Sequence, residues 1–211
     1  MSGSGAPSNE KYDRLAEGFS EREYADPVQY AARRAKAIVA LGPRVEGGES
    51  LLDLGCGDGI MAEPLLAYGL VYSGVDASEQ MVEACRRRHP GLAFEASPSE
   101  SYQPSGPVDI TICLRAFYYP EDRLAFFRHV ASYTRLKFVF DFREVVHPAE
   151  IVVRDLRAAG FHRIELRPFF TPQSRRVPSP LLPLVDALER SGPLAARLSR
   201  RAGRMFCSAA V

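Results

Sequence analysis

Apolar positions along the chain follow two different periods, and the two kinds of segment alternate. Short, nearly continuous apolar runs favour buried strands, whereas apolar residues three or four positions apart favour amphipathic helices. The runs predict strands near 50–54, 70–75, 92–96, 108–114 and 135–142. The helical periods between them predict helices near 59–68, 78–89, 120–133 and 148–159. Because strands and helices alternate, the sequence predicts an α/β fold with a doubly wound sheet flanked by helices.

The segments on either side of this alternating region differ from it. Before it, Asp26 and Pro27 are typical of a helix N-cap and first turn, and Gly42 ends the helical spacing that follows. After it, we expect a strand over 161–170, a proline-rich stretch, a helix near 184–200 and a last strand over 204–210. Residues 1–9 are rich in Ser, Gly and Pro, so we expect a disordered tail before a single domain spanning 10–211.

Composition and charge narrow the class of protein. The chain has 211 residues, 46% apolar and 25% charged, as is usual for one globular domain. Its net charge of +1, without a basic stripe interleaved with aromatic residues, predicts that it binds no nucleic acid. No signal peptide and no apolar run of membrane-spanning length is visible, so we expect a cytoplasmic protein with no transmembrane segment. Arginine far outnumbers lysine, which suggests a bacterial source with a GC-rich genome.

The cysteine pattern indicates free thiols. Cys56, Cys85, Cys113 and Cys207 form no Cys-x-x-Cys pair, and each falls in a predicted strand, turn or helix. A reducing cytoplasm fits this pattern better than disulfides or a zinc site. No histidine has the spacing of a metal ligand, and we propose no metal site.

The most informative motif follows the first predicted strand. Residues 51–60 read Leu-Leu-Asp-Leu-Gly-Cys-Gly-Asp-Gly-Ile, so the acidic Asp53 precedes glycines at 55, 57 and 59. An apolar run that ends in such a glycine turn is typical of the start of a βαβ unit, where the backbone approaches a ligand closely. Dinucleotide-binding proteins have the spacing Gly-x-Gly-x-x-Gly, and a P-loop needs a following Lys-Ser/Thr. The glycine spacing and Asp53 therefore make an NAD(P)-dependent oxidoreductase the less favoured alternative.

The pattern Asp-x-Gly-x-Gly-x-Gly resembles the cofactor motif of class I S-adenosylmethionine (SAM) methyltransferases that act on small molecules. The run from Val75 to Cys85, with Asp76 at its second position, resembles the second motif of the same family. The resemblance extends from Tyr12 to the last strand. It implies a Rossmann-like, seven-stranded sheet that is mostly parallel with an antiparallel last strand. It also implies an N-terminal lid over 10–45 and an insert at about 171–203 between the last two strands.

The same resemblance assigns the residues that hold SAM. The turn would hold the methionine and ribose portions, Asp76 the ribose hydroxyls, and Met81 and Ser97 the adenine. Ser97 stands where the family often has Asp. Leu114 and Arg115 would flank the methionine portion, and Tyr12 and Phe19 would close the lid. Arg33, on the first long helix, would either reach the carboxylate of SAM or lie on the solvated surface, which we favour. The cofactor-binding candidates are therefore Tyr12, Phe19, Arg33, Asp53, Gly55, Cys56, Gly57, Asp76, Ala77, Met81, Ser97, Leu114 and Arg115.

The sequence is less informative about the methyl acceptor. No catalytic base is evident; Tyr118 and His147 are weak candidates, and a hydroxyl acceptor benefits from a base more than an amine does. The expected partner is a small-molecule acceptor such as a natural product or a lipid-like compound. Apolar residues beside arginines in the insert would cap such a substrate or touch a membrane surface. We favour a third interpretation, in which the insert is a structural cover. A SAM-binding protein without catalysis stays an open alternative, and the oligomeric state is unknown.

Overall fold

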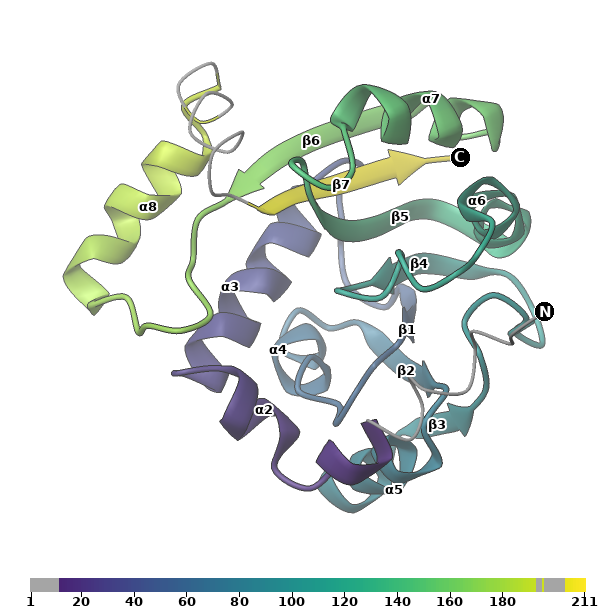
Figure 1. Cartoon of the computed structure of the whole chain (residues 1–211), viewed down its shortest axis with the longest axis horizontal. Coiled ribbons are helices and arrows are strands. Elements are labelled where there is room, and N and C mark those ends of the chain that lie inside the picture. Colours follow the sequence, from purple (N-terminus) through teal and green to yellow (C-terminus); the bar gives the residue numbers. More distant parts are fainter. Residues whose placement is uncertain (1–11, 193–194, 196–203) are drawn as a thin grey trace.

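The computed structural model describes residues 12–192, 195 and 204–211. Its strands are β1 (Ser50–Leu54), β2 (Val71–Asp76), β3 (Ala93–Ala96), β4 (Val108–Cys113), β5 (Thr134–Arg143), β6 (Arg163–Phe169) and β7 (Arg204–Ala210). They form one seven-stranded sheet in the order β3-β2-β1-β4-β5-β7-β6 (Figure 1). Strands β1 to β5 pair in parallel, and β7 lies antiparallel between β5 and β6. The predicted fold class is confirmed.

Helices cover both faces of the sheet. They are α2 (Phe19–Glu23), α3 (Pro27–Ala40), α4 (Ala62–Leu66), α5 (Glu79–Arg88), α6 (Arg123–Tyr133), α7 (Ala149–Ala158), the short 3-10 helix η1 (Ser179–Leu181) and α8 (Leu182–Glu189). Phe138, Phe140 and Phe142 of β5 lie in a buried cluster with α6 and α7, whereas Val139 lies in a cluster with α3, α4 and α5. Because both faces of β5 are buried, its sequence is an almost continuous apolar run.

Local signals fixed the helix boundaries. Asp26 is an N-cap, as predicted, and accepts from Gln29 N at 2.9 Å; Ser78 caps α5 in the same way and accepts from Met81 N at 3.2 Å. The helix expected over 120–133 begins later, at residue 123, because Asp122 caps it. The one expected over 59–68 spans only 62–66, since the glycine turn uses left-handed backbone conformations that a helix cannot include. Most of the predicted helix beyond residue 190 and the tail over 1–9 lie outside the described residues.

A buried lysine of β5 holds the end of α3. Lys137 is fully buried, and its Nζ donates to the carbonyl oxygens of Ile38 at 2.9 Å, Leu41 at 2.6 Å and Pro43 at 3.0 Å. The last carbonyls of a helix lack partners within the helix and attract a cation. Lys137 therefore fixes α3 against the sheet, and α3 carries one wall of the cavity described below.

The segment between β6 and β7 packs on α3. Arg33 of α3 forms ion pairs with Asp186 and, at 2.9 Å, with Glu189 of α8. Lys36 reaches Asp186 at 2.5 Å. Figure 1 shows α8 beside α3, at the margin of the molecule. None of the helices in the part of the chain that the structure describes has the length and apolar character that crossing a bilayer requires.

Candidate functional site

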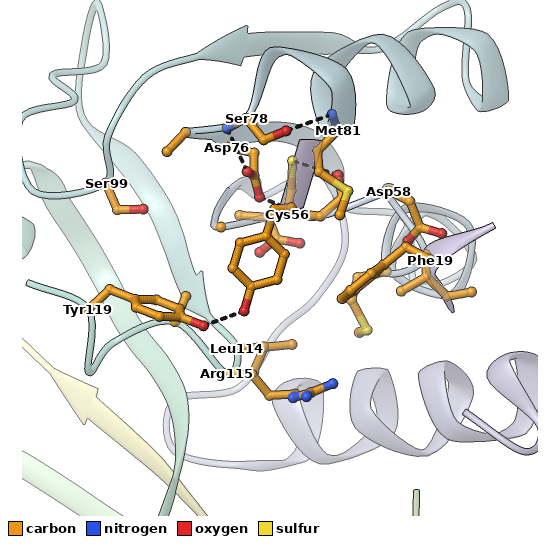
Figure 2. Close-up of a pocket in the computed structure, with 18 of the residues that line it drawn as sticks. Phe19, Cys56, Asp58, Asp76, Ser78, Met81, Ser99, Leu114, Arg115 and Tyr119 are labelled. Carbon is orange, nitrogen blue, oxygen red and sulfur yellow. Dashed lines mark hydrogen bonds between the residues drawn. The ribbon is translucent and has the colours of Figure 1, made fainter. Parts of the chain in front are cut away.

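A cavity of about 480 Å³ opens at the carboxyl ends of β1, β2 and β4, where ligands bind in open α/β sheets. Most of the side chains that the sequence assigned to a cofactor meet there. The lining includes Tyr12, Phe19, Asp53, Gly55, Cys56, Gly57, Asp76, Ala77, Met81, Leu114, Arg115 and Tyr118. In Figure 2, Asp76, Ser78 and Met81 lie on one side, and Leu114, Arg115 and Tyr119 on the opposite side. Their contacts with a cofactor stay predictions.

The glycine turn brings the backbone to the cavity. Gly55, Gly57 and Gly59 have φ values of 76°, 58° and 77°, which side chains rarely permit. A Cβ added at Gly55 would lie 2.7 Å from the Cβ of Ala116. The turn folds back on β2, because Gly55 N and Cys56 N donate to the carbonyl of Val75 at 2.8 and 3.0 Å. The backbone conformation thus requires glycine at all three positions, and at Gly55 the lack of space for a side chain requires it as well.

Asp53 is a buried carboxyl group with one free oxygen. Its Oδ2 accepts a hydrogen bond from the hydroxyl of Tyr72 at 2.6 Å, while Oδ1 has no partner among the described residues. Burial raises the pKa of Asp53 to about 7, although the Tyr72 hydrogen bond opposes this shift. An unpartnered buried acceptor is costly, so this oxygen fits a ligand that brings a donor or a positive charge.

Asp76 lies across the turn from Asp53. Its Oδ2 accepts from Gly57 N at 2.8 Å and its Oδ1 from Ser78 N at 3.0 Å, so the carboxylate has a fixed orientation. Burial raises its pKa, and the two backbone donors oppose that shift. Each carboxylate oxygen has a second lone pair, which leaves acceptor capacity for a diol such as the ribose hydroxyls.

The arginine expected to meet the cofactor is corrected by the structure. Arg33 does not line the cavity, because its guanidinium faces α8 and also donates to Thr171 Oγ1 at 3.0 Å. The next residue, Arg34, lines the cavity instead and is 3% exposed. Its Nε and Nη2 have no hydrogen-bond partner among the described residues. Arg34 shares a buried helix face with Ala31 and Ile38, but the helical period alone does not show that this face meets the cavity.

Ser97 is also not brought to the cavity. Its backbone N–H donates to the carbonyl of Asp76 at 2.9 Å, which extends the pairing of β2 with β3 by one residue. The chain turns inward only after this point, and the next residues, Pro98, Ser99 and Glu100, line the cavity. Ser97 is therefore not in the cavity lining, although β3 ends at residue 96 as expected, and its contact with a cofactor stays a prediction.

Asp141, near the carboxyl end of β5, contacts one backbone N–H and two guanidinium groups behind the cavity. It is fully buried, and its Oδ1 accepts from the backbone N–H of Arg115 at 2.6 Å. Its Oδ2 lies 3.1 Å from Arg204 Nη1 and 3.5 Å from Arg34 Nη2. Among the described residues, Arg115 alone has a positive φ without being glycine, at 59°. The bond to Asp141 holds this strained backbone, which aims the end of β4 into the cavity.

The N-terminal segment closes over the glycine turn. Phe19 lines the cavity, and the following Ser20 donates its hydroxyl to Asp58 Oδ1 at 2.6 Å. Asp58 lies inside the turn, between two of its glycines. On the other side, Ser78 Oγ donates to Asp13 at 2.5 Å, and the hydroxyls of Tyr12 and Tyr119 are hydrogen-bonded (Figure 2). No local signal in the sequence predicts the Ser20–Asp58 pair, because the two residues are distant in the chain.

Of the two candidate bases, only Tyr118 lines the cavity. Burial raises the pKa of Tyr118, which keeps its phenol protonated. His147 stacks on the Tyr118 ring with centroids 6.3 Å apart and planes 13° apart. Burial and Arg123 lower the pKa of His147. The structure therefore gives His147 a supporting position behind Tyr118.

The thiols are buried and unbridged. Cys56 lines the cavity, and its Sγ lies 3.8 Å from that of Cys85. The contact with Cys85 and burial raise the pKa of the Cys56 thiol, which disfavours a nucleophilic role. Within the described ranges, no group of three or more His, Cys, Asp or Glu side chains could hold a metal ion.

Comparison with known proteins relates the part of the chain that forms the cavity to methyltransferases. Residues 51–136, which include the glycine turn, Asp76 and the tyrosines after β4, match a family model described as a methyltransferase domain. A trans-aconitate 2-methyltransferase from Rhizobium etli is 32% identical over 114 residues, which are 53% of this chain and 44% of that protein. A ubiquinone biosynthesis O-methyltransferase from Caulobacter vibrioides is 30% identical over 91 residues, 40% of this chain and 36% of that protein. The matches thus span less than half of either relative.

A solved structure extends the similarity of fold to the whole chain. The magnesium protoporphyrin IX methyltransferase from Synechocystis, determined with bound SAM, has a TM-score of 0.59 and 19% identity. The match covers 100% of this chain and 87% of that one. At this identity, the similarity concerns the fold. The curated relatives are bacterial, in agreement with the source suggested by the composition.

Replacing Asp141 by asparagine tests its role behind the cavity. D141N keeps the shape but removes the charge, so the buried guanidinium of Arg34 loses its counterion. We expect the free energy of unfolding to fall by about 3–5 kcal/mol, measured by urea denaturation followed by circular dichroism. The control E83Q removes an exposed ion pair with Arg87 and should cost less than about 0.5 kcal/mol. A loss below about 1 kcal/mol for D141N would contradict this assignment.

Proposed function

We propose that this chain is a SAM-dependent methyltransferase that transfers a methyl group to a small-molecule acceptor. One observation carries the proposal: two carboxyl groups, the buried Asp53 and the half-buried Asp76, flank one glycine turn at the ends of neighbouring strands and line the same cavity. The match of residues 51–136 to a methyltransferase domain supports it. We infer one catalytic domain over 10–211, with the lid at 10–45 and the insert at about 171–203.

The described residues fit SAM group by group. The free Oδ1 of Asp53 suits the ammonium of the methionine portion, and the unpartnered N–H groups of Arg34 suit its carboxylate. Asp76 would accept the ribose hydroxyls, and Met81, buried beside it, would border the adenine. The two acids and one base therefore match the charges and donors of the ligand.

SAM supplies a methyl group on a cationic sulfur, so the protein's contribution is largely positional. An in-line transfer needs the donor and acceptor held in one geometry. The backbone of Leu114 and Arg115 would hold the methionine portion, since the Asp141 bond fixes it. The lid contacts of Tyr12 and Phe19 would exclude water from the reacting atoms. Because Tyr118 stays protonated, its phenol would orient the acceptor rather than remove its proton.

The two alternatives have distinct signatures. A binding protein without catalysis would bind SAM but turn over no acceptor. The NAD(P)-dependent oxidoreductase is disfavoured because Asp53 lies buried where a dinucleotide would bring its pyrophosphate near the turn. Calorimetric titration with SAM and with NAD separates this alternative from the proposal.

SAM binding to D76N tests the proposed function. The substitution keeps an acceptor for one backbone N–H but removes the charge that two ribose hydroxyls would share. We expect wild type to bind SAM and D76N to bind it about 10–100-fold more weakly, as for loss of a charged hydrogen bond. The control E83Q lies on the exposed side of α5 and should bind like wild type. Binding of NAD in place of SAM would overturn the proposal.

Adjacent arginines on α3 provide a matched pair of variants. R34Q removes the cation that lines the cavity, so SAM affinity should fall about tenfold or more, as for a lost charged hydrogen bond. R33Q removes the ion pairs with α8 and should lower the melting temperature while leaving SAM affinity within about twofold of wild type. Calorimetry and thermal denaturation of both variants make the comparison. The reverse order of affinities would restore Arg33 as the ligand.

The pKa of Asp53 predicts how SAM affinity depends on pH. Because the folded, ligand-free carboxyl has a pKa of about 7, it is mostly protonated at pH 6 and must lose a proton to pair with an ammonium. We expect the affinity to fall by up to about tenfold per unit as pH drops below 7, with proton release on binding. The isosteric variant D53N should bind weakly with a nearly flat profile between pH 5.5 and 7.5. An unchanged slope in D53N would assign the titration to another group.

A further inference from the structure

The side of the cavity opposite Asp76 is formed largely by phenol rings. Tyr12, Tyr118 and Tyr119, which we call the tyrosine wall, all line it. The rings of Tyr12 and Tyr119 meet edge to face at 6.2 Å, and those of Tyr118 and Tyr119 lie 4.8 Å apart. Tyr118 and Tyr119 are nevertheless 41% and 48% exposed. Large exposed aromatic side chains at the mouth of a cavity indicate a binding surface.

The tyrosine wall has firm support from behind. The ring of Phe117 is fully buried and meets Tyr118 edge to face at 5.7 Å, while His147 stacks on Tyr118. The two residues before His147, Val145 and Val146, are 60% and 58% exposed and extend the apolar character beyond the wall. A supported aromatic surface favours flat, apolar ligands, because the rings are already ordered before binding.

The charges of the lining oppose an anionic acceptor. The cavity is lined by two guanidinium groups: Arg34 is the group proposed above for the carboxylate of SAM, and Arg115 pairs with Glu23 at 3.2 Å, so neither is left for the acceptor. Carboxyl groups outnumber them in the lining even without Asp58, which pairs with Arg88 at 3.0 Å; the others are Asp53, Asp76, Glu100 and Glu121. A substrate with several carboxylates would meet net repulsion and find no unpaired cation in this part of the chain.

We propose that the acceptor is an uncharged, flat aromatic molecule that stacks on the tyrosine wall and carries its nucleophilic oxygen or nitrogen on the ring. This proposal rests on the proposed methyl transfer. The acceptor's oxygen or nitrogen forms the new bond to the methyl carbon, and the sulfur–carbon bond breaks with its electron pair left on sulfur. The proton of the acceptor passes to solvent. Tyr118 and Tyr119 are then specificity-determining residues, and the chain differs in substrate class from a relative that methylates trans-aconitate.

Binding of a neutral aromatic probe tests this inference. Protein saturated with S-adenosylhomocysteine is titrated with 2-naphthol and followed by naphthol fluorescence, which is well resolved because the chain has no tryptophan. We expect saturable binding that Y118A weakens about tenfold, since it deletes a stacking ring. Y119F keeps the ring and should stay within about threefold of wild type. The control V71A, at an exposed position of β2 outside the cavity lining, should match wild type.

The outcomes separate the two levels of the proposal. Failure of S-adenosylhomocysteine and SAM to bind would refute the proposed function. With the donor site occupied, absence of naphthol binding, or equal binding by Y118A, would overturn the acceptor inference alone. Displacement of naphthol by trans-aconitate, a tricarboxylate, would do the same, because it would show that the site accepts polyanions. Far-UV circular dichroism of each variant establishes that it is folded.

Discussion

The structure around the cavity depends on one buried carboxylate, Asp141. It lies near the carboxyl end of β5 and contacts groups from α3, from the turn after β4 and from β7. A buried ion is tolerated only when it is paired, so none of these elements can move alone without exposing an unpaired charge. The buried guanidinium of Arg34 needs this carboxylate as its counterion, since its other close contact among the described residues is with the Tyr30 ring.

This constraint orders the cavity before any ligand arrives. Lys137 fixes the end of α3, the Asp141 pair fixes its middle, and the Ser20–Asp58 bonds join the preceding helix to the glycine turn. The site therefore has a rigid side built on strand ends and a closing side built on the N-terminal segment. Preorganisation of this kind lowers the entropic cost of binding a flexible donor such as SAM.

The two sides of the cavity differ in chemistry, and this difference follows the expected division between donor and acceptor. The proposed donor side presents the carboxyl groups of Asp53 and Asp76, whose unmet hydrogen-bonding capacity suits a cation and a diol. The proposed acceptor side presents phenol rings supported by Phe117 and His147. Burial raises the pKa of both Asp53 and Tyr118, but with opposite consequences: the acid becomes titratable near neutrality, whereas the phenol stays protonated.

The sequence by itself determined the order of strands and helices, the glycine turn, and the places of Asp53 and Asp76. These features depend on local periodicity and on short motifs, so they are readable without knowing the fold. Only the tertiary structure decided that Arg34 rather than Arg33 faces the cavity, because adjacent helical residues point about 100° apart and the phase depends on packing. It likewise brought Pro98, Ser99 and Glu100 rather than Ser97 to the cavity, joined Tyr12 to Tyr119, and brought Arg115, Arg204 and Arg34 together at Asp141. Those contacts join residues far apart in the chain, and a single sequence contains no local signal for them.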